Sequence, residues 1–220
     1  MNAIEILWSY RYAFIDGFTV TLELLALACL IGTILGIGLE LLSRIFRVLR
    51  QIVDAVAFCV SAIPALVILF WLYYPAQSVS GVSLSPFWTA AISLVVINAF
   101  AVYRIVADAV ADFPQQYVSS ALVCGLKPTE ILRYIQGPLL VRAALPRWID
   151  QQVVILQTSV FASLISVEEI FRVAQRINSI VYQPVVIYTS MAIVFLVTAG
   201  SAMYLAMVLR KRFYRDLSEH

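Results

Sequence analysis

Five long apolar stretches constrain the fold of this chain more than any other feature. A helix needs roughly 20 apolar residues to cross the hydrocarbon core of a bilayer, and each stretch is about that long. The five lie at about 18–42, 53–74, 87–110, 148–167 and 185–209. Only 13% of the 220 residues are charged, which is about half of the share in an average soluble chain. We therefore expect part of the protein surface to face lipid.

Helices are the expected structure of these stretches because backbone polar groups inside a bilayer must be satisfied within the protein. The alternating pattern of membrane β-barrel strands is absent from the sequence. The prediction is an all-α membrane protein with one domain over residues 1–220 and five transmembrane helices. Its longest loop would cover about 112–147, and Pro64 would put a plain kink in the second helix.

Basic residues are concentrated in alternate loops of this predicted fold. The loop after the first stretch holds Arg44, Arg47 and Arg50, whereas the next loop, at 75–86, holds no Lys or Arg. Basic residues return in the long loop and after the last stretch, at Lys127, Arg133, Arg142, Arg147, Arg210, Lys211, Arg212 and Arg215. Because basic loops stay in the cytoplasm, we expect the N-terminus outside and both the long loop and the C-terminus inside.

The segment SSALVCGLKPTEILRYIQGPLL, at 119–140, is typical of two short helices joined by a turn. Gly125 can adopt the left-handed conformation that ends a first helix at about 115–124. Pro128 suits the first turn of the second helix, and the Gly-Pro pair at 137–138 is expected to stop it. Two short helices at an angle form a compact knob, which can insert into a groove on a partner.

This segment resembles the cytoplasmic EAA loop of permease subunits in ABC importers. In that loop a Gly follows four positions after the last Ala, and a Pro follows thirteen positions after the Gly. Here Ser119-Ser120-Ala121 stands for EAA, Gly125 for the Gly and Pro138 for the Pro. The two serines depart from the usual Glu and Ala.

The resemblance covers most of the chain and is closest to the polar amino acid permeases. It extends over TVTLELLALACLIGTILGIGLELL, AIPALVILFWLYYP and LQTSVFASLISVEEIFRVAQRI, in that order. It implies the fold of a type I ABC importer permease in a bacterial inner membrane, carrying an amino acid or a related small polar solute. It also implies three partners: ABC ATPase subunits, a second permease that is identical or paralogous, and an extracytoplasmic solute-binding protein.

The same resemblance implies that the knob couples the permease to its ATPase. The residues expected to do so are Ser119, Ser120, Ala121, Gly125, Leu126, Pro128, Ile131 and Pro138. Neither Lys127 nor Lys211 follows a glycine, so the chain lacks a phosphate-binding P-loop. The only histidine is His220, which excludes a His-based metal cluster. We expect no catalytic residue, metal site, cofactor or nucleic-acid partner, and we expect ATP hydrolysis on another chain.

Four polar residues inside the predicted spans are candidates for a solute path. Arg104 and Asp108 are four apart, so they share a helix face and can pair. A charge at this depth costs about 2.5–3.5 kcal/mol and usually faces a bundle interior or an aqueous path. The two residues either contact solute or form a self-satisfied pair near the interface. In similar permeases an acid often replaces Arg104, so Arg104 predicts a preference for anionic groups such as a carboxylate.

Gln157 and Thr158 are the other two candidates, because bulk water cannot reach them in the middle of a span. They either bond to neighbouring helices or line the path, and the resemblance favours the path. Ahead of the fifth span, a short amphipathic helix is expected in which Glu168 and Glu169 pair with Arg172. This helix is either simply solvated or serves as a gate or docking face for the binding protein.

Small residues in the first span, Gly32, Gly36 and Gly38, allow close helix contacts, which we expect within the subunit rather than between subunits. The residues themselves leave two other classes of function open. One is a secondary transporter or channel subunit without an ATPase partner, and the other is a membrane assembly protein with no solute path.

The loop charges predict which side of the membrane can be labelled. In a variant whose three cysteines are replaced by serine, a single cysteine at Ser80 should react with an impermeant thiol reagent from outside. A single cysteine at Lys127 should react only after the membrane is opened. Labelling of both positions in sealed cells would contradict the predicted topology.

Overall fold

The computed structural model describes residues 3–218, with side chains for residues 5–212, and all secondary structure in this part is helical. Arg215 and His220, named above, lie outside the described side chains. Three helices are each long and apolar enough to cross a membrane: α2 (Arg11–Ile45), α6 (Pro86–Ala111) and α11 (Pro184–Ser218). Two bent helix pairs pass the same test, so the described residues hold three to five candidate spans. The all-helical prediction is confirmed.

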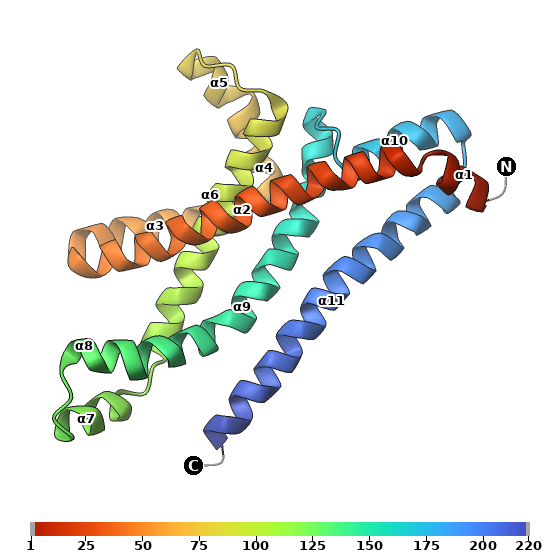
Figure 1. Ribbon diagram of the computed structural model, residues 1–220. Helices are drawn as coiled ribbons and strands as arrows, with labels where there is room; N and C mark the ends of the chain where they lie inside the picture. Colours follow the sequence, from red (N-terminus) through yellow and green to blue (C-terminus); the bar gives the residue numbers. More distant parts are fainter. Residues whose placement is uncertain (1–2, 219–220) are drawn as a thin grey trace.

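The first helices form a hairpin with a sharp corner at its end. After the short α1 (Ala3–Ser9) and the long α2, the extended residue Phe46 reverses the chain, and α3 (Arg47–Ala62) runs back beside α2 (Figure 1). The chain then turns by 100° into α4 (Ala65–Tyr73) and α5 (Pro75–Ser80). Pro64 was expected to cause only a kink, but Ile63 before it is extended, so the helix ends and restarts.

Helices α2 and α6 approach closely through two glycines. A Cβ at Gly36 would lie 2.5 Å from the carbonyl oxygen of Ala99, and a Cβ at Gly32 would lie 2.9 Å from the Cβ of Asn98. By contrast, nothing lies within 4 Å of the Cβ position at Gly38. Packing within the subunit is therefore confirmed for Gly32 and Gly36 but not for Gly38.

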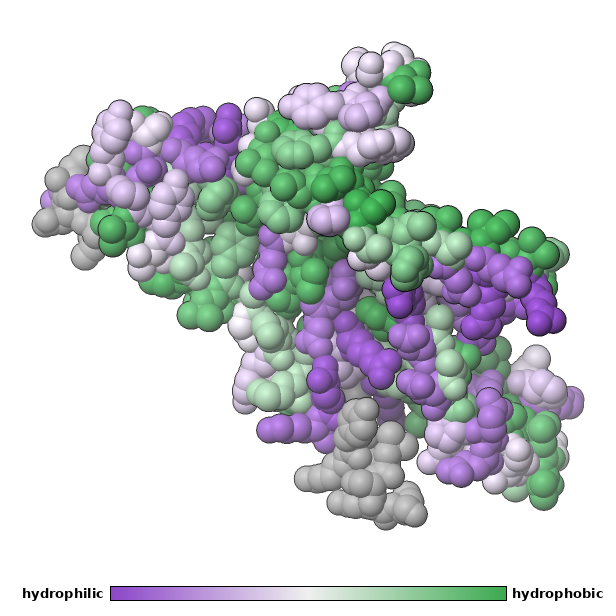
Figure 2. Space-filling view, turned by 180° about the vertical axis from the view of Figure 1, so that it is seen from behind, coloured by the Kyte–Doolittle hydropathy of each residue, from purple (hydrophilic) through white to green (hydrophobic). Residues whose placement is uncertain are grey.

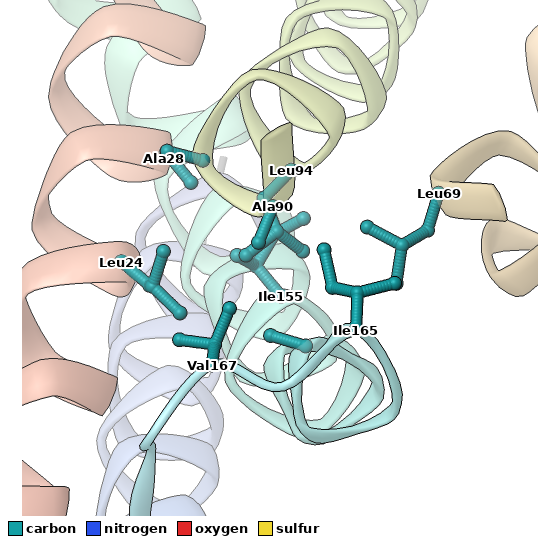
Figure 3. Packing of buried hydrophobic residues seen from close by; sticks show 10 residues of the cluster. Leu24, Ala28, Leu69, Ala90, Leu94, Ile155, Ile165 and Val167 are labelled. Carbon is teal, nitrogen blue, oxygen red and sulfur yellow. The ribbon is translucent and has the colours of Figure 1, made fainter. Parts of the chain in front are cut away.

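Amide side chains join α9 (Gly137–Thr158) to this helix pair. Asn98 of α6 donates to the carbonyl oxygen of Ala28 in α2 at 2.8 Å and exchanges two hydrogen bonds with Gln152 of α9, at 3.2 and 3.3 Å. Trp148 donates to the Thr33 hydroxyl at 2.9 Å. Figure 3 shows the apolar core beside these bonds, where side chains of α2, α4, α6, α9 and the following turn meet.

The knob leads without a break into α9. It consists of α7 (Gln115–Val123) and α8 (Pro128–Ile131), and a π turn at Leu132–Gln136 connects α8 to α9. The expected stop at Gly137-Pro138 is wrong. The Gly137 N–H donates to the carbonyl oxygen of Leu132, five residues back, and this wider turn lets the helix continue past Pro138. The fourth apolar stretch is therefore the second half of a longer helix.

A 3₁₀ segment, η2 (Ser159–Ile165), follows α9, and left-handed Ser166 leads toward α10 (Ile170–Val181). The apolar face of α10 packs on α1, α2 and α11, where Ile170, Val173, Ala174 and Ile177 are buried with Ile6, Ile187 and Met191. Much of α11 is exposed along its apolar length, as at Leu196 and Val197. On the face drawn in Figure 2, hydrophobic side chains cover the upper middle, whereas hydrophilic ones gather at the upper left and over much of the lower part.

The contrast between two glycines of α2 gives a matched test of the helix contact. Replacing Gly36 by alanine should push α2 away from α6 and lower the free energy of unfolding by about 1–3 kcal/mol, as overpacking does. Replacing Gly38 by alanine should leave it unchanged or raise it by up to about 1 kcal/mol, because that position faces open space and alanine is the better helix former. Unfolding in a detergent titration measures both variants, and equal stability of the two would contradict the close contact.

Candidate functional site

The turn of the knob is fixed by a glycine and by two backbone bonds. Gly125 has a φ of +80°, as predicted. The N–H of Leu126 donates to the carbonyl oxygen of Ala121 at 3.1 Å, and the N–H of Gly125 donates to that of Leu122 at 3.0 Å. These two bonds form a Schellman motif, which closes the end of α7. The turn therefore has one defined backbone conformation and is not a flexible loop.

The second helix of the knob begins with an equally well-defined cap. Pro128 occupies its first turn, as predicted, and the Glu130 carboxylate accepts the backbone N–H of Lys127 at 2.8 Å. A carboxylate in the first turn also suits the positive end of the helix dipole. The end of α7 is thus closed by two backbone bonds, and the start of α8 is closed by the Glu130 carboxylate, so both sides of the turn are held by local contacts.

The eight predicted coupling residues divide into an inner and an outer group. Ala121 and Ile131 are buried and hold the knob together. The residues at the surface are Ser119, Ser120, Gly125, Leu126, Pro128 and Pro138, of which Pro138 belongs to α9 rather than to the knob.

Sequence reasoning missed two apolar side chains at the tip of the knob. Val123 is 88% exposed and Leu122 is 52% exposed, next to the exposed Leu126. The sequence signal for them is two adjacent apolar residues that only Cys124 separates from the helix-ending Gly125. An apolar tip on a rigid turn has the form of a surface that is covered by a partner.

The four candidate path residues do not meet in one pocket of this subunit. Thr158 borders a small hollow between α4, α6 and η2, where Ser93, Ile97 and Phe161 are among its neighbours. Gln157 is exposed and does not line this hollow, and neither do Arg104 and Asp108. The Thr158 hydroxyl donates to the carbonyl oxygen of Val154 at 2.7 Å, so the lone pairs of its oxygen can still accept a hydrogen bond from a bound molecule.

Arg104 is directed at α3 and not at Asp108. Its guanidinium donates to the Ser61 hydroxyl at 3.3 Å, in the last turn of α3 before the corner at Pro64. Both Arg104 and Asp108 are exposed, and within the described residues they form no ion pair with each other. Pairing of the two was possible from their spacing, but the packing of α3 on α6 offers Arg104 a different partner.

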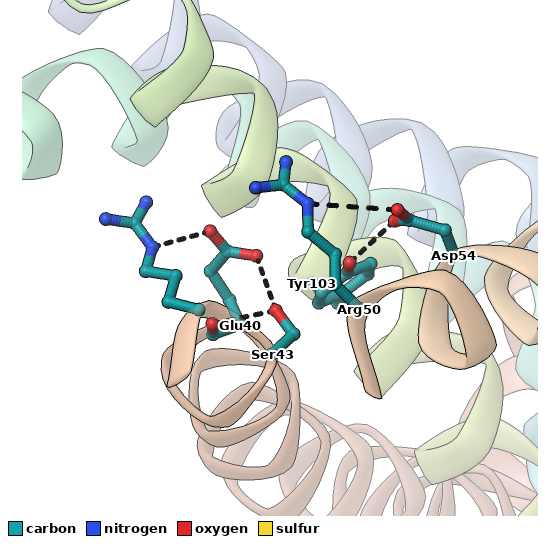
Figure 4. Close-up of polar contacts among 6 residues, drawn as sticks. Glu40, Ser43, Arg50, Asp54 and Tyr103 are labelled. Carbon is teal, nitrogen blue, oxygen red and sulfur yellow. Dashed lines mark hydrogen bonds and ion pairs between the residues drawn. The ribbon is translucent and has the colours of Figure 1, made fainter. Parts of the chain in front are cut away.

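Polar side chains of α2, α3 and α6 lie together beside Arg104. The sequence alone did not predict this cluster. The Tyr103 hydroxyl donates to Asp54 of α3 at 2.6 Å, and Arg50 lies 3.9 Å from the same carboxylate (Figure 4). Glu40 of α2, which is 1% exposed, is paired with Arg44 at 2.8 Å and accepts from Ser43. The sequence signal for this pair is Glu40 itself, an acid inside an apolar run and four residues before Arg44. Two consecutive residues of α6 thus hold α3 in place.

The helix ahead of the last span differs from the prediction in its ion pairs. Glu169 is fully buried and caps α10, because its carboxylate accepts the N–H groups of Phe171 and Arg172. Glu168 pairs with Arg176 at 3.3 Å rather than with Arg172. An open hollow lies over this polar face and is lined by Glu168, Arg172, Gln175, Arg176 and Ser179. The predicted amphipathic helix is confirmed, but its two predicted pairings with Arg172 are wrong.

Comparisons with known proteins agree with this architecture. Residues 28–215 match the protein family described as the inner membrane component of binding-protein-dependent transport systems. The octopine transport system permease protein OccM of Rhizobium radiobacter is 25% identical over 87% of this chain and 82% of its own. The histidine/lysine/arginine/ornithine transport system permease protein HisM of Escherichia coli K12 is also 25% identical, over 87% of this chain and 84% of its own.

Two solved structures share the fold. A crystal structure of an amino acid ABC transporter with histidines superposes with a TM-score of 0.86 at 21% identity, covering 96% of this chain and 99% of the other. An inward-facing methionine ABC transporter, MetNI, superposes with a TM-score of 0.71 at 16% identity, covering 92% and 97%. The arrangement of helices in this chain is therefore that of ABC importer permeases.

Proposed function

Because the chain belongs to the family of inner membrane components of binding-protein-dependent transport systems, we propose a specific way in which it imports its solute. It is a multi-pass permease subunit of an ABC importer, which excludes the alternatives of a secondary transporter and of an assembly protein. Its solute is an amino acid or a related compound. The names of the relatives support this class, since they transport octopine or histidine, lysine, arginine and ornithine.

The knob couples this permease to a separate ATPase subunit. The observation that carries this proposal is the rigid turn at Gly125, with the exposed apolar side chains of Leu122 and Val123 beside it. A partner that grips such a tip can move it as one body, because the Schellman bonds and the cap at Lys127 leave it little freedom. The motion reaches the spans directly, since α8 continues into α9.

The shape and charge of the chain support two further partners in this proposal, a second permease subunit and a solute-binding protein. A second permease subunit, identical or paralogous, completes the path, because the four candidate path residues do not close a pocket in one subunit. An extracytoplasmic solute-binding protein docks on the polar face of α10, where the open hollow beside Arg172 and Arg176 offers basic groups. In this arrangement the N-terminus lies outside and the knob and the C-terminus lie in the cytoplasm.

Arg104 contributes a cation to the solute path. Its only hydrogen-bond partner among the described residues is the neutral Ser61 hydroxyl, at a long 3.3 Å, and its side chain is exposed. A cation with so little compensation favours a carboxylate, which every free amino acid carries. Arg104 lies beside the corner between α3 and α4, so a bound carboxylate would contact the place where the second span changes direction.

The coupling proposal predicts that Gly125→Val uncouples ATP hydrolysis from uptake. A left-handed residue with a side chain costs about 1–2 kcal/mol, and a β-branched residue should force the turn into another shape. Gly81→Val is the matched control, because Gly81 has a φ of +68°, also with nothing within 4 Å, but lies far from the knob. Uptake, solute-stimulated ATPase activity and pull-down of the ATPase subunit are measured in reconstituted complex.

We expect Gly125→Val, and also Leu126→Asp at the tip, to lose ATPase association or coupled transport while the spans still insert. Gly81→Val should retain both. If the two knob variants kept assembly and coupled uptake at the wild-type level, the knob would not be the coupling element.

The proposal for Arg104 predicts that Arg104→Gln raises the KM for uptake about tenfold or more, the usual effect of losing a hydrogen bond to a charged group. Ser61→Ala separates this role from a structural one, since it removes only the partner of Arg104 within the protein. Uptake kinetics of labelled amino acids should be affected by the first change and nearly normal after the second. Equal defects in both variants would assign Arg104 to holding α3.

A further inference from the structure

An arginine lies between two exposed aromatic rings at the corner where α1 meets α2. The Cζ atom of Arg11 is 4.5 Å from the centroid of the Trp8 ring and 4.4 Å from that of the Tyr12 ring. The guanidinium donates to the carbonyl oxygen of Trp8 at 2.7 Å and to the Tyr12 hydroxyl at 3.3 Å. The two rings are 68% and 66% exposed. The arginine is therefore held in a fixed position while its surroundings stay open.

Within the residues that the structure describes, the charge of Arg11 is not compensated by a carboxylate. A guanidinium has five N–H donors, and two of them are used in the bonds described above. The nearest acids along the chain are Glu5 and Asp16, and within the described residues neither forms an ion pair with Arg11. The remaining donors can bind an anion with oxygen acceptors.

The length of α2 allows this corner to lie outside the hydrocarbon core, among the lipid headgroups. A helix of 35 residues is about 52 Å long, whereas the hydrocarbon core is about 30 Å thick. Ile15, one turn further along α2, is 55% exposed, so an apolar side chain is open to the surroundings close to the corner. Trp and Tyr gather at the boundary between membrane and water, and phospholipid phosphates lie at the same level.

We propose that Arg11, framed by Trp8 and Tyr12, binds the phosphate group of a phospholipid in the leaflet at the amino end of α2. The guanidinium fits phosphate oxygens through paired N–H donors, and the two rings contact the adjoining glycerol and upper acyl chain. Charge complementarity and the continuity with exposed Ile15 favour a lipid over a docked soluble protein, which does not reach below the headgroups.

This contact would connect the lipid to α10. Ile6 of α1 is fully buried, and it packs in the same cluster as Val173 and Ile177 of α10 and Ile187 of α11. Figure 1 shows α1, α10 and the start of α11 together at this end of α2. A lipid held by Arg11 and its two rings thus fixes the position of α1, and through Ile6 it supports the packed face of α10.

The first test measures the depth of Trp8 in the purified transporter complex in nanodiscs. Phosphatidylcholine brominated near the headgroup or deep in the acyl chain quenches nearby tryptophans. The fluorescence lost in Trp8→Phe gives the signal of Trp8 alone, and we expect shallow bromines to quench it more strongly than deep ones. Absence of quenching at either depth would overturn the proposal, because the ring would then lie outside the bilayer.

The second test measures how much phosphatidylglycerol the complex retains after detergent extraction, by native mass spectrometry. Arg11→Gln should reduce this retention about fivefold, the effect of one basic residue near the membrane surface. Arg210→Gln is the matched control, because Arg210 is also exposed but already paired with Asp150, so lipid retention should not change. If Arg11→Gln left lipid retention intact and instead weakened capture of the solute-binding protein, the partner would be a protein and the proposal would be wrong.

Discussion

The contact between α2 and α6 is the constraint on which the other helices depend. In lipid there is little hydrophobic force between helices, so association relies on close backbone packing and on bonds between polar groups. Gly32 and Gly36 provide the first, since a side chain at either position would meet α6. Asn98 provides the second, because its amide reaches α2 and Gln152 of α9 together. One small region thus positions three helices. Because η2 continues directly from α9, the side chains that α9 and η2 contribute to the apolar core are positioned with them.

Polar ties then fix the helices that leave this region. At one end, Tyr103 and Arg104 each bond to α3, at Asp54 and Ser61, so α3 is held along two turns before the corner at Pro64. At the other end, Thr21 accepts the backbone N–H of Ile170 at 3.2 Å, which joins the start of α10 to α2. The helices that carry the candidate solute path and the candidate docking face are therefore both fixed in position by bonds to α2 or α6.

The sequence predicted features that depend on local chemistry. The apolar spans, the left-handed turn at Gly125 and the first-turn proline at 128 each follow from a few neighbouring residues. The features that it missed depend on packing between distant segments. Pro64 makes a corner rather than a kink because α4 packs on α6 and η2. Arg104 bonds to Ser61 rather than to Asp108 because α3 folds back beside it. The continuation of the helix through Gly137-Pro138 is a local exception, because the π turn bonds the Gly137 N–H to the carbonyl oxygen of Leu132 and so accommodates the proline.

The unbroken helical path from Pro128 to Ile165 has a mechanical consequence. Its turns change from α to π, back to α and then to 3₁₀, but no residue along it leaves a helical conformation. Such a path resists compression and stretching along its length better than a loop does, so a displacement applied at its first turn is passed on toward its last turn. The compliant element comes only afterwards, at left-handed Ser166 and the short extended link to Ile170. Strain that enters at one side of the membrane is therefore absorbed at this link, next to the buried cap of α10.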